Sequence, residues 1–232
     1  EPAREVQAIE AALDRQVDGI VFAAMRTREV FVPDVPTNTP VVMLNGTSSR
    51  FKTSVLPDEF EGGRFAVSLL HAAGIRDGIA LIGHNEMVER GLFRSETVAR
   101  RLAGIRHEMA ARNLGFIAEE SCWEWEPHHG YEIVSRLLRQ GTAPKALLCL
   151  NDRIAFGAYQ ALAEAGLSIP GNVSVVSFDD DEIAAYLRPG LTTIALPHEQ
   201  MGRESIGLLL ARQDAIEILV PMPLVRRGSL PS

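Results

Sequence analysis

The sequence predicts an α/β fold built on parallel sheets. Short apolar segments alternate with amphipathic helical segments along almost the whole chain. The apolar segments lack the period-two alternation of strands that have one solvated face, so they suit strands buried on both faces. Glycine follows the expected end of several helices, where a left-handed residue commonly stops a helix. Together these observations favour parallel strands joined by right-handed helical crossovers.

Helices and strands alternate in the expected order of elements. The helices, each marked by apolar residues on one face, are expected at 6–13, 65–74, 98–113, 131–140 and 154–165. The strands are expected at 19–22, 40–44, 78–83, 116–118, 146–150 and 173–178. The polar segment 84–95 directly follows a strand. It is therefore predicted to be a loop at the carboxyl edge of a sheet, where open α/β sheets bind their ligands.

Composition and charge describe a globular chain that does not hold nucleic acid by itself. The chain has 232 residues, of which 46% are hydrophobic and 23% are charged, which is enough apolar material for a large core. No segment approaches the roughly 20 apolar residues that a membrane span needs. The formal net charge is −7, and an acidic surface repels phosphate backbones. Contact with DNA would therefore have to come from another segment.

The sequence lacks the common signatures of enzymes and cofactor sites. There is no phosphate-binding loop, no dinucleotide-binding glycine motif, no nucleophile elbow and no Cys-x-x-Cys pair. His198-Glu199 begins like a zinc-protease motif, but Gly202 occupies the position of the second histidine. The acidic run 179–182 lacks the ligand spacing of a calcium loop. We therefore expect no enzyme activity, no cofactor and no metal site, and we expect Cys149 to be a small apolar filler.

Several segments form a set that is more specific than any one of them. The longest begins Asn151-Asp152-Arg153-Ile154-Ala155-Phe156-Gly157 and continues to Phe178-Asp179-Asp180. The others are Val17-Asp18-Gly19-Ile20-Val21, Pro40-Val41-Val42, Asp58 with Gly62-Gly63, Arg101-Leu102-Ala103-Gly104, Leu191-Thr192-Thr193-Ile194 and Leu224-Val225-Arg226-Arg227-Gly228-Ser229. As a set they closely resemble the effector-binding domain of LacI/GalR-family transcriptional regulators. The resemblance covers nearly all of the chain.

The resemblance implies two Rossmann-like lobes with parallel sheets, joined by three crossover strands, in the periplasmic-binding-protein-like type I fold. The N-terminal lobe would comprise 1–55 and 196–220, and the C-terminal lobe 56–195 and 221–232. Members of the family open the first lobe with a strand, a helix and another strand, which have no counterpart before Glu1. We therefore expect an incomplete N-terminal lobe. The helix-turn-helix DNA-binding head of the family is also absent from this sequence.

The resemblance implies an allosteric repressor core and not an enzyme. A small effector, expected to be a sugar, would bind in the cleft between the lobes and alter operator binding through the missing head. We expect a cytoplasmic homodimer without membrane contact, because a symmetric dimer suits a pseudo-palindromic operator. Tyr186 and Pro189 are the expected interface residues, with ordinary packing as the alternative. The alternative function is that of a periplasmic sugar-binding protein of an ABC transporter, which shares the two-lobed fold.

Asp179 and Arg101 are the leading candidates for effector binding. Asp179 directly follows a predicted strand, and its position in the resembling family accepts hydrogen bonds from the effector. A helix N-cap is the alternative role, which Asp180 fits better. Arg101 matches the family's arginine, whose planar fork binds sugar hydroxyls or acidic effectors. Arg100 is the rival of Arg101, and a solvated surface arginine is the alternative role.

Three further residues are effector-binding candidates. Asn151 ends a predicted strand and opens a helix, so its amide can act both as N-cap and as ligand contact. Trp125 matches a family aromatic residue that lies against the effector ring, with Trp123 as its rival and a core position as the alternative. Asn45, at the end of the strand 40–44, is the candidate from the first lobe.

Overall fold

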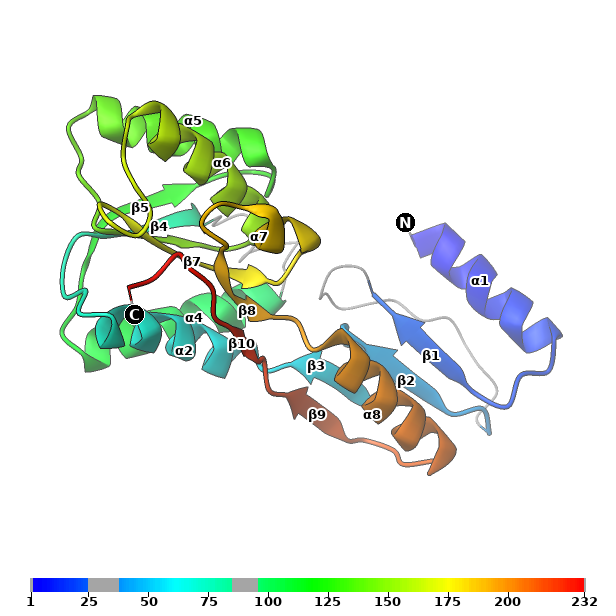
Figure 1. Ribbon diagram of the computed structural model, residues 1–232. Helices are drawn as coiled ribbons and strands as arrows, with labels where there is room; N and C mark the ends of the chain where they lie inside the picture. Colours follow the sequence, from blue (N-terminus) through cyan, green and yellow to red (C-terminus); the bar gives the residue numbers. More distant parts are fainter. Residues whose placement is uncertain (1, 25–37, 85–95, 232) are drawn as a thin grey trace. The chain divides into compact units, whose positions relative to one another are not determined.

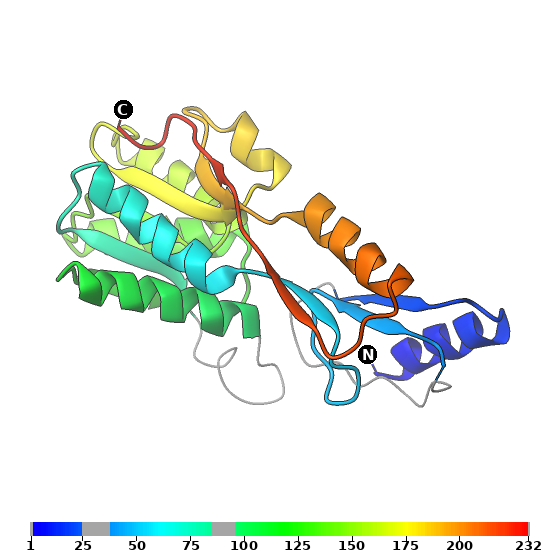
Figure 2. The same cartoon turned by 90° about the horizontal axis from the view of Figure 1, so that it is seen from below.

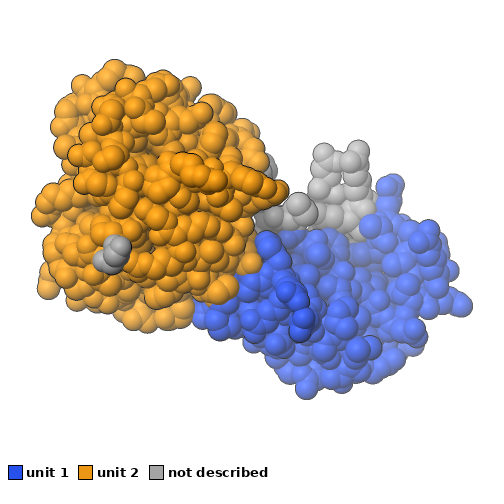
Figure 3. Space-filling model, viewed as in Figure 1, with its two compact units in different colours: residues 1–58, 92–97, 197–221 blue, residues 59–91, 98–196, 222–232 orange. Residues whose placement is uncertain are grey.

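The computed structural model describes residues 2–24, 38–84 and 96–231, and it confirms the α/β fold with mainly parallel sheets. The chain divides into two compact units (Figure 3). Unit 1 comprises Glu1–Asp58, Leu92–Thr97 and Pro197–Pro221, and unit 2 comprises Glu59–Gly91, Val98–Leu196 and Met222–Ser232. Among the described residues, no helix has both the length and the apolar character that a membrane crossing requires.

Unit 2 is built on a six-stranded sheet with the strand order β10-β8-β7-β6-β4-β5 (Figure 1). In chain order its strands are β4 Ile79–His84, β5 Phe116–Ser121, β6 Ala146–Cys149, β7 Ser174–Asp179, β8 Thr192–Ala195 and β10 Leu224–Val225. Neighbouring strands pair in parallel, except that β10 is antiparallel to β8. The carboxyl ends of β4, β6 and β7 therefore lie along one edge of the sheet, and the residues that follow them gather there.

Helices cover both faces of this sheet (Figures 1 and 2). They are α2 Glu59–Ala72, α4 Glu96–Ala111, α5 Pro127–Arg139, α6 Asp152–Glu164 and the short α7 Glu182–Tyr186. Along β4, Ile79 and Leu81 join the core with α2 and α4, whereas Ala80 and Ile82 join the core with α5 and α6. Both faces of the strand are buried, which explains why the sequence shows apolar runs instead of alternation.

Unit 1 is built on a four-stranded parallel sheet with the order β1-β2-β3-β9. Its strands are β1 Ile20–Ala23, β2 Val41–Leu44, β3 Ser54–Pro57 and β9 Glu217–Val220, and its helices are α1 Pro2–Asp14 and α8 His198–Leu210. Ile9 of α1 packs with Val41 and Met43, whereas Met201 of α8 packs in a second cluster with Val42. Successive residues of β2 point to opposite faces, so the two helices cover opposite faces of the sheet.

The structure corrects one helix boundary and adds elements that the pattern of apolar residues did not predict. The helix expected at 131–140 begins at Pro127, because a proline in the first helical turn needs no intrahelical partner for an N–H group. The added elements are β3, α7, β8, α8, β9 and β10. Of the loop expected at 84–95, only His84 is described, and it ends β4; the remainder lies outside the described residues.

Both cysteines are buried free thiols. Burial raises the pKa of Cys122 to about 11, and it raises the pKa of Cys149 in β6 still further. Neither thiol ionises near neutral pH, and the thiolate is the reactive form of cysteine. The position of Cys149 within a fully buried strand agrees with its expected role as an apolar filler.

Candidate functional site

A close approach of α2 and α4 positions the charged centre of unit 2. A Cβ atom added to Gly63 of α2 would overlap the carbonyl oxygen of Arg101, and one added to Gly104 of α4 would overlap the carbonyl oxygen of Phe60. Glycine therefore suits both crossing points, because it brings no side chain between the two backbones. Glu59 lies about one helical turn before Gly63, and Arg101 lies nearly one turn before Gly104. The side chains of Glu59 and Arg101 consequently meet.

Arg101 is the centre of this cluster, and only 2% of its side chain is exposed. Its Nε donates to Oε2 of Glu59 at 2.6 Å, and its Nη2 donates to Oε1 of Glu59 at 2.8 Å. Nη2 also lies 3.4 Å from Oδ1 of Asp179, and Nη1 donates to the carbonyl oxygen of Leu150. The guanidinium carbon lies 4.2 Å from the centroid of the Phe178 ring. The predicted effector-binding fork is thus bound to a carboxylate of its own chain.

Charge pairing keeps the guanidinium of Arg101 ionised. Burial alone would lower its pKa, but the charges of Glu59 and Asp179 outweigh burial and raise the pKa above its ordinary value. Two carboxylates surround one guanidinium, so this cluster carries a formal charge of about −1 when all three groups are ionised. We call Glu59, Arg101 and Asp179 the charged triad.

Asp179 is the most exposed member of the charged triad. Its side chain is 27% exposed, whereas those of Arg101 and Glu59 are 2% and 1% exposed. It ends β7 with a φ of +103°, a conformation that is unusual for a residue with a Cβ atom. Its carbonyl oxygen accepts a hydrogen bond from the N–H of Leu196 at 3.2 Å, which helps to hold this conformation. Its contact with an effector stays a prediction.

The residues after β7 have structural roles that correct one expectation. The N-cap of α7 is Asp181, whose carboxylate accepts a hydrogen bond from the N–H of Ile183 at 3.1 Å. Asp180 was the expected cap, but its carboxylate lies 2.7 Å from Nη2 of Arg227 in an ion pair. The expectation for Asp180 is therefore wrong by one residue.

Asp152 supports this segment from the first turn of α6. Its carboxylate accepts hydrogen bonds from the N–H of Asp181 at 2.7 Å and from the hydroxyl of Ser177. Burial is the main cause that raises the pKa of Asp152 to about 7, and the charge of Asp179 adds to this effect. Asp152 therefore links β7, the segment after it and α6, and it acts as a positioning residue.

Asn151 and Trp125 lie beside the charged triad. Oδ1 of Asn151 accepts a hydrogen bond from the N–H of Ile154 at 2.9 Å, which confirms its N-cap role. Its Nδ2 donates to the carbonyl oxygen of Trp125 at 3.4 Å. The indole Nε1 of Trp125 donates to the carbonyl oxygen of Gly83 at 2.9 Å, and its ring centroid lies 5.8 Å from the guanidinium carbon of Arg101. Effector contact by Asn151 and Trp125 stays a prediction.

The rival candidates and Asn45 have different surroundings. Trp123 is 64% exposed, in contrast to the half-buried Trp125. Arg100 is half-buried, whereas Arg101 is buried at the centre of the triad. Asn45 follows β2 in unit 1 with a φ of +54°, and its Nδ2 donates to the carbonyl oxygen of Ala24 at 3.0 Å. Its role in effector binding also stays a prediction.

Glu59 is the residue that sequence reasoning missed. The analysis quoted the adjacent Asp58 and the glycines Gly62 and Gly63, but it assigned Glu59 no role. The available signal is a pair of helices that each carry a glycine one turn after a charged residue of opposite sign. That signal depends on which helices are neighbours, so a single segment does not reveal it.

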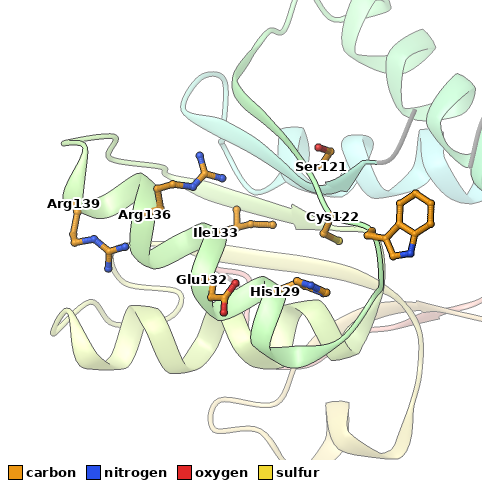
Figure 4. Close-up of a pocket in the computed structure, with 8 residues that line it drawn as sticks. Ser121, Cys122, His129, Glu132, Ile133, Arg136 and Arg139 are labelled. Carbon is orange, nitrogen blue, oxygen red and sulfur yellow. The ribbon is translucent and has the colours of Figure 1, made fainter. Parts of the chain in front are cut away.

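A groove of about 450 Å³ lies beside α5, away from the charged triad (Figure 4). Its lining residues are Ser121, Cys122, Trp123, His129, Glu132, Ile133, Arg136 and Arg139. Arg136 is already paired with Glu120 at 2.7 Å. None of the predicted effector-binding residues lines this groove, so we place the candidate site at the sheet edge. Within the described ranges, no group of three or more His, Cys, Asp or Glu residues is arranged to hold a metal ion.

Comparisons with known proteins match this arrangement of elements and residues. The family model described as "Periplasmic binding protein-like domain" matches residues 67–230. The chain is 30% identical over 217 residues to the HTH-type transcriptional repressor PurR of Actinobacillus pleuropneumoniae serotype 3 (strain JL03), covering 91% of this chain and 62% of that protein. It is 29% identical over 211 residues to the ribose operon repressor of Haemophilus influenzae, covering 89% and 60%. The chain thus spans less than two thirds of the length of these relatives.

Solved structures show the same fold. The lactose repressor bound to the anti-inducer ONPF has a TM-score of 0.77 and 27% identity, with 97% of this chain and 82% of that chain covered. A sugar-binding transcriptional regulator of the LacI family from Escherichia coli, complexed with phosphate, has a TM-score of 0.74 and 30% identity, with 97% and 81% covered.

These matches define the class of the chain, which is a periplasmic binding protein-like domain. Within that class the chain belongs to the LacI family of transcriptional regulators, as its effector-binding domain. The predicted family and fold are therefore confirmed. The named relatives are repressors and not enzymes, in agreement with the expectation of a binding domain.

Proposed function

We propose that this domain senses a small polyhydroxyl effector, most simply a sugar, for a LacI-type repressor. The observation that carries the proposal is the gathering of Asp179, Asn151 and Trp125 around Arg101 at the carboxyl edge of the unit 2 sheet. A sugar ring needs hydrogen-bond acceptors and donors for its hydroxyl groups and an aromatic surface for its C–H groups. The names of two relatives, the ribose operon repressor and the sugar-binding regulator, support this choice of effector.

For the whole protein, we propose that effector binding changes operator affinity through an N-terminal helix-turn-helix head and a homodimer. Coupling free energies of allosteric proteins are typically about 1–3 kcal/mol, so the expected change in operator affinity is about 5- to 150-fold. Tyr186, which is 68% exposed, and Pro189 are the proposed interface residues. Asn45 is the proposed effector contact of the first lobe. The repressor relatives favour this function over transport by a periplasmic sugar-binding protein.

A thermal-shift screen of the purified chain tests the effector class. The panel contains neutral mono- and disaccharides, sugar phosphates and nucleobases. A ligand at 100 times its dissociation constant adds about 2.7 kcal/mol of stability, which gives a clear shift in Tm. We expect a neutral sugar to raise Tm and Asp179→Asn to abolish the shift, because the amide replaces one acceptor oxygen with a donor.

Asp77→Asn is the matched control. Asp77 is also in unit 2, but its carboxylate is 68% exposed and is paired with Lys145 on the surface. This variant removes the same charge and should keep the sugar-induced shift. A shift with nucleobases alone would contradict the sugar proposal. A sugar-induced shift that survives Asp179→Asn would contradict the placement of the site.

A further inference from the structure

Glu59 occupies the part of Arg101 that an anionic ligand would need. The two side chains form a bidentate pair, with Nε–Oε2 and Nη2–Oε1 distances of 2.6 and 2.8 Å. Bidentate recognition is the usual way in which an arginine binds a ligand carboxylate or phosphate. Because Glu59 and Arg101 are 1% and 2% exposed, a ligand anion would first have to displace a buried carboxylate.

The remaining donors of Arg101 are almost all in use. A guanidinium has five N–H groups. Two of them bind Glu59, one binds Leu150 and one faces Asp179, which leaves one of the five. The face of the guanidinium lies against Phe178 at 4.2 Å. Arg101 therefore orients the carboxylates around it, and it has no second fork to offer.

The group that a ligand meets at this edge is a carboxylate. Asp179 is 27% exposed, while the positive charge behind it is covered. The nearby carboxylate of Asp180 is balanced by Arg227 at 2.7 Å, so this ion pair leaves the excess negative charge of the triad uncompensated. A carboxylate accepts hydrogen bonds from O–H and N–H groups and repels other anions.

We propose that Glu59 determines the charge class of the effector. By neutralising Arg101, it makes the site select neutral, hydroxyl-rich ligands and reject the same ligands when they carry a phosphate or carboxylate group. This inference rests on the proposed function, since it concerns the site around Asp179. It assigns a specificity role to a residue that also stabilises the domain.

Matched ligand pairs test the inference on the wild-type chain. Each neutral sugar of the screen is paired with its phosphate and its uronic acid, for example ribose with ribose 5-phosphate and glucose with glucuronate. Dissociation constants are measured by calorimetry at constant ionic strength, with inorganic phosphate as an additional probe. We expect the anionic member of the binding pair to be weaker by about 100-fold or more, because a like charge is placed close to Asp179.

Glu59→Gln should reverse this preference in part. The variant removes one negative charge from the triad and leaves Arg101 paired with Asp179, so affinity for the anionic member should rise by about tenfold or more. Glu61→Gln is the matched control on the same helix. Glu61 is 55% exposed and paired with Arg64 at 2.9 Å, so its variant changes the net charge equally without touching Arg101. Its ligand preference should equal that of the wild type.

The outcomes separate the two proposals. Anionic members that bind the wild type as tightly as their neutral partners would overturn the role of Glu59 while leaving sugar sensing intact. A gain of anion affinity in Glu61→Gln as large as that in Glu59→Gln would also overturn it. Failure of every sugar and sugar derivative to bind the folded wild type would overturn the proposed function, and this inference with it. The wild-type comparison needs no variant to fold.

Discussion

Replacing Arg101 by methionine removes the charge of the triad and keeps an unbranched apolar side chain. Two carboxylates then face each other without a cation, and Glu59 is the costlier one because it is 1% exposed whereas Asp179 is 27% exposed. Removing one partner of a buried ion pair typically costs about 3–5 kcal/mol. The loss of the hydrogen bond to Leu150 and of the contact with Phe178 acts in the same direction. We therefore expect Arg101→Met to lower the free energy of unfolding by about 3–5 kcal/mol.

Urea denaturation followed by tryptophan fluorescence measures this loss. Trp123 and Trp125 are the two tryptophans of the chain, and both belong to unit 2, so the signal reports on the unit that holds Arg101. Glu59→Gln should cost less, about 1–3 kcal/mol, because Arg101 keeps its other partners. The double variant should cost clearly less than the sum of the single variants, since each substitution removes the other's unpaired charge. Additive losses, or a loss below about 1 kcal/mol for Arg101→Met, would refute this reasoning.

Three further substitutions test the local structure. Gly104→Ala should lower the free energy of unfolding by about 1–3 kcal/mol, because its Cβ would overlap the carbonyl oxygen of Phe60. Gly207→Ala, on the exposed surface of α8 with no atom near its Cβ position, should raise it by about 0.5–1 kcal/mol; equal effects in circular-dichroism melts would contradict the close helix approach. Burial raises the pKa of Asp152 to about 7, so the folded state binds a proton more tightly than the unfolded chain, and this group's contribution to stability falls as the pH rises from about 4 to 7. Asp152→Asn should therefore lose less stability than the wild type between pH 4.5 and 7.5, and parallel stability curves would contradict the shift. Asn151→Ala should lower the free energy of unfolding by about 1–2 kcal/mol by removing the N-cap of α6, measured by urea denaturation with Asn151→Asp as the variant that keeps the cap.

The elements that the sequence predicted are those whose burial leaves a plain pattern. In β4 all residues are buried, and hydrophobic letters mark the strand on both faces. In β8 the first two residues are Thr192 and Thr193, which are fully buried although they are polar. The hydroxyl of Thr192 donates to the carbonyl oxygen of Arg227, a residue far along the chain, so no apolar run marks this strand. The sequence pattern around β8 therefore looked like a connection.

The helix α8 escaped prediction for a different reason. Gly202 and Gly207 lie inside it, and each lowers the local helix propensity. Met201 and Leu208 nevertheless bury one side of the helix against the unit 1 sheet. Packing against a sheet made of distant segments stabilises this helix, and that information is not local.

The candidate site divides in the same way. Asp179 and Asn151 could be found because they directly follow predicted strands, and the ends of parallel strands share one edge of a sheet. The partner of Arg101 could not be found, because it depends on two helices that cross where Gly63 and Gly104 are placed. An arginine that resembles a ligand-binding residue by position can thus be bound to its own chain.

The unequal burial of the charged triad has a consequence for how the site can change over evolutionary time. Loss of Arg101 leaves an enclosed carboxylate unpaired, whereas loss of the charge of Glu59 leaves Arg101 with Asp179 and Leu150 as partners. Substitutions are therefore tolerated in one order only, with Glu59 changing first and Arg101 afterwards. A lineage that adopts a charged effector is expected to pass through an ancestor with an uncharged residue at position 59, and related chains without the arginine should also lack the acidic residue there.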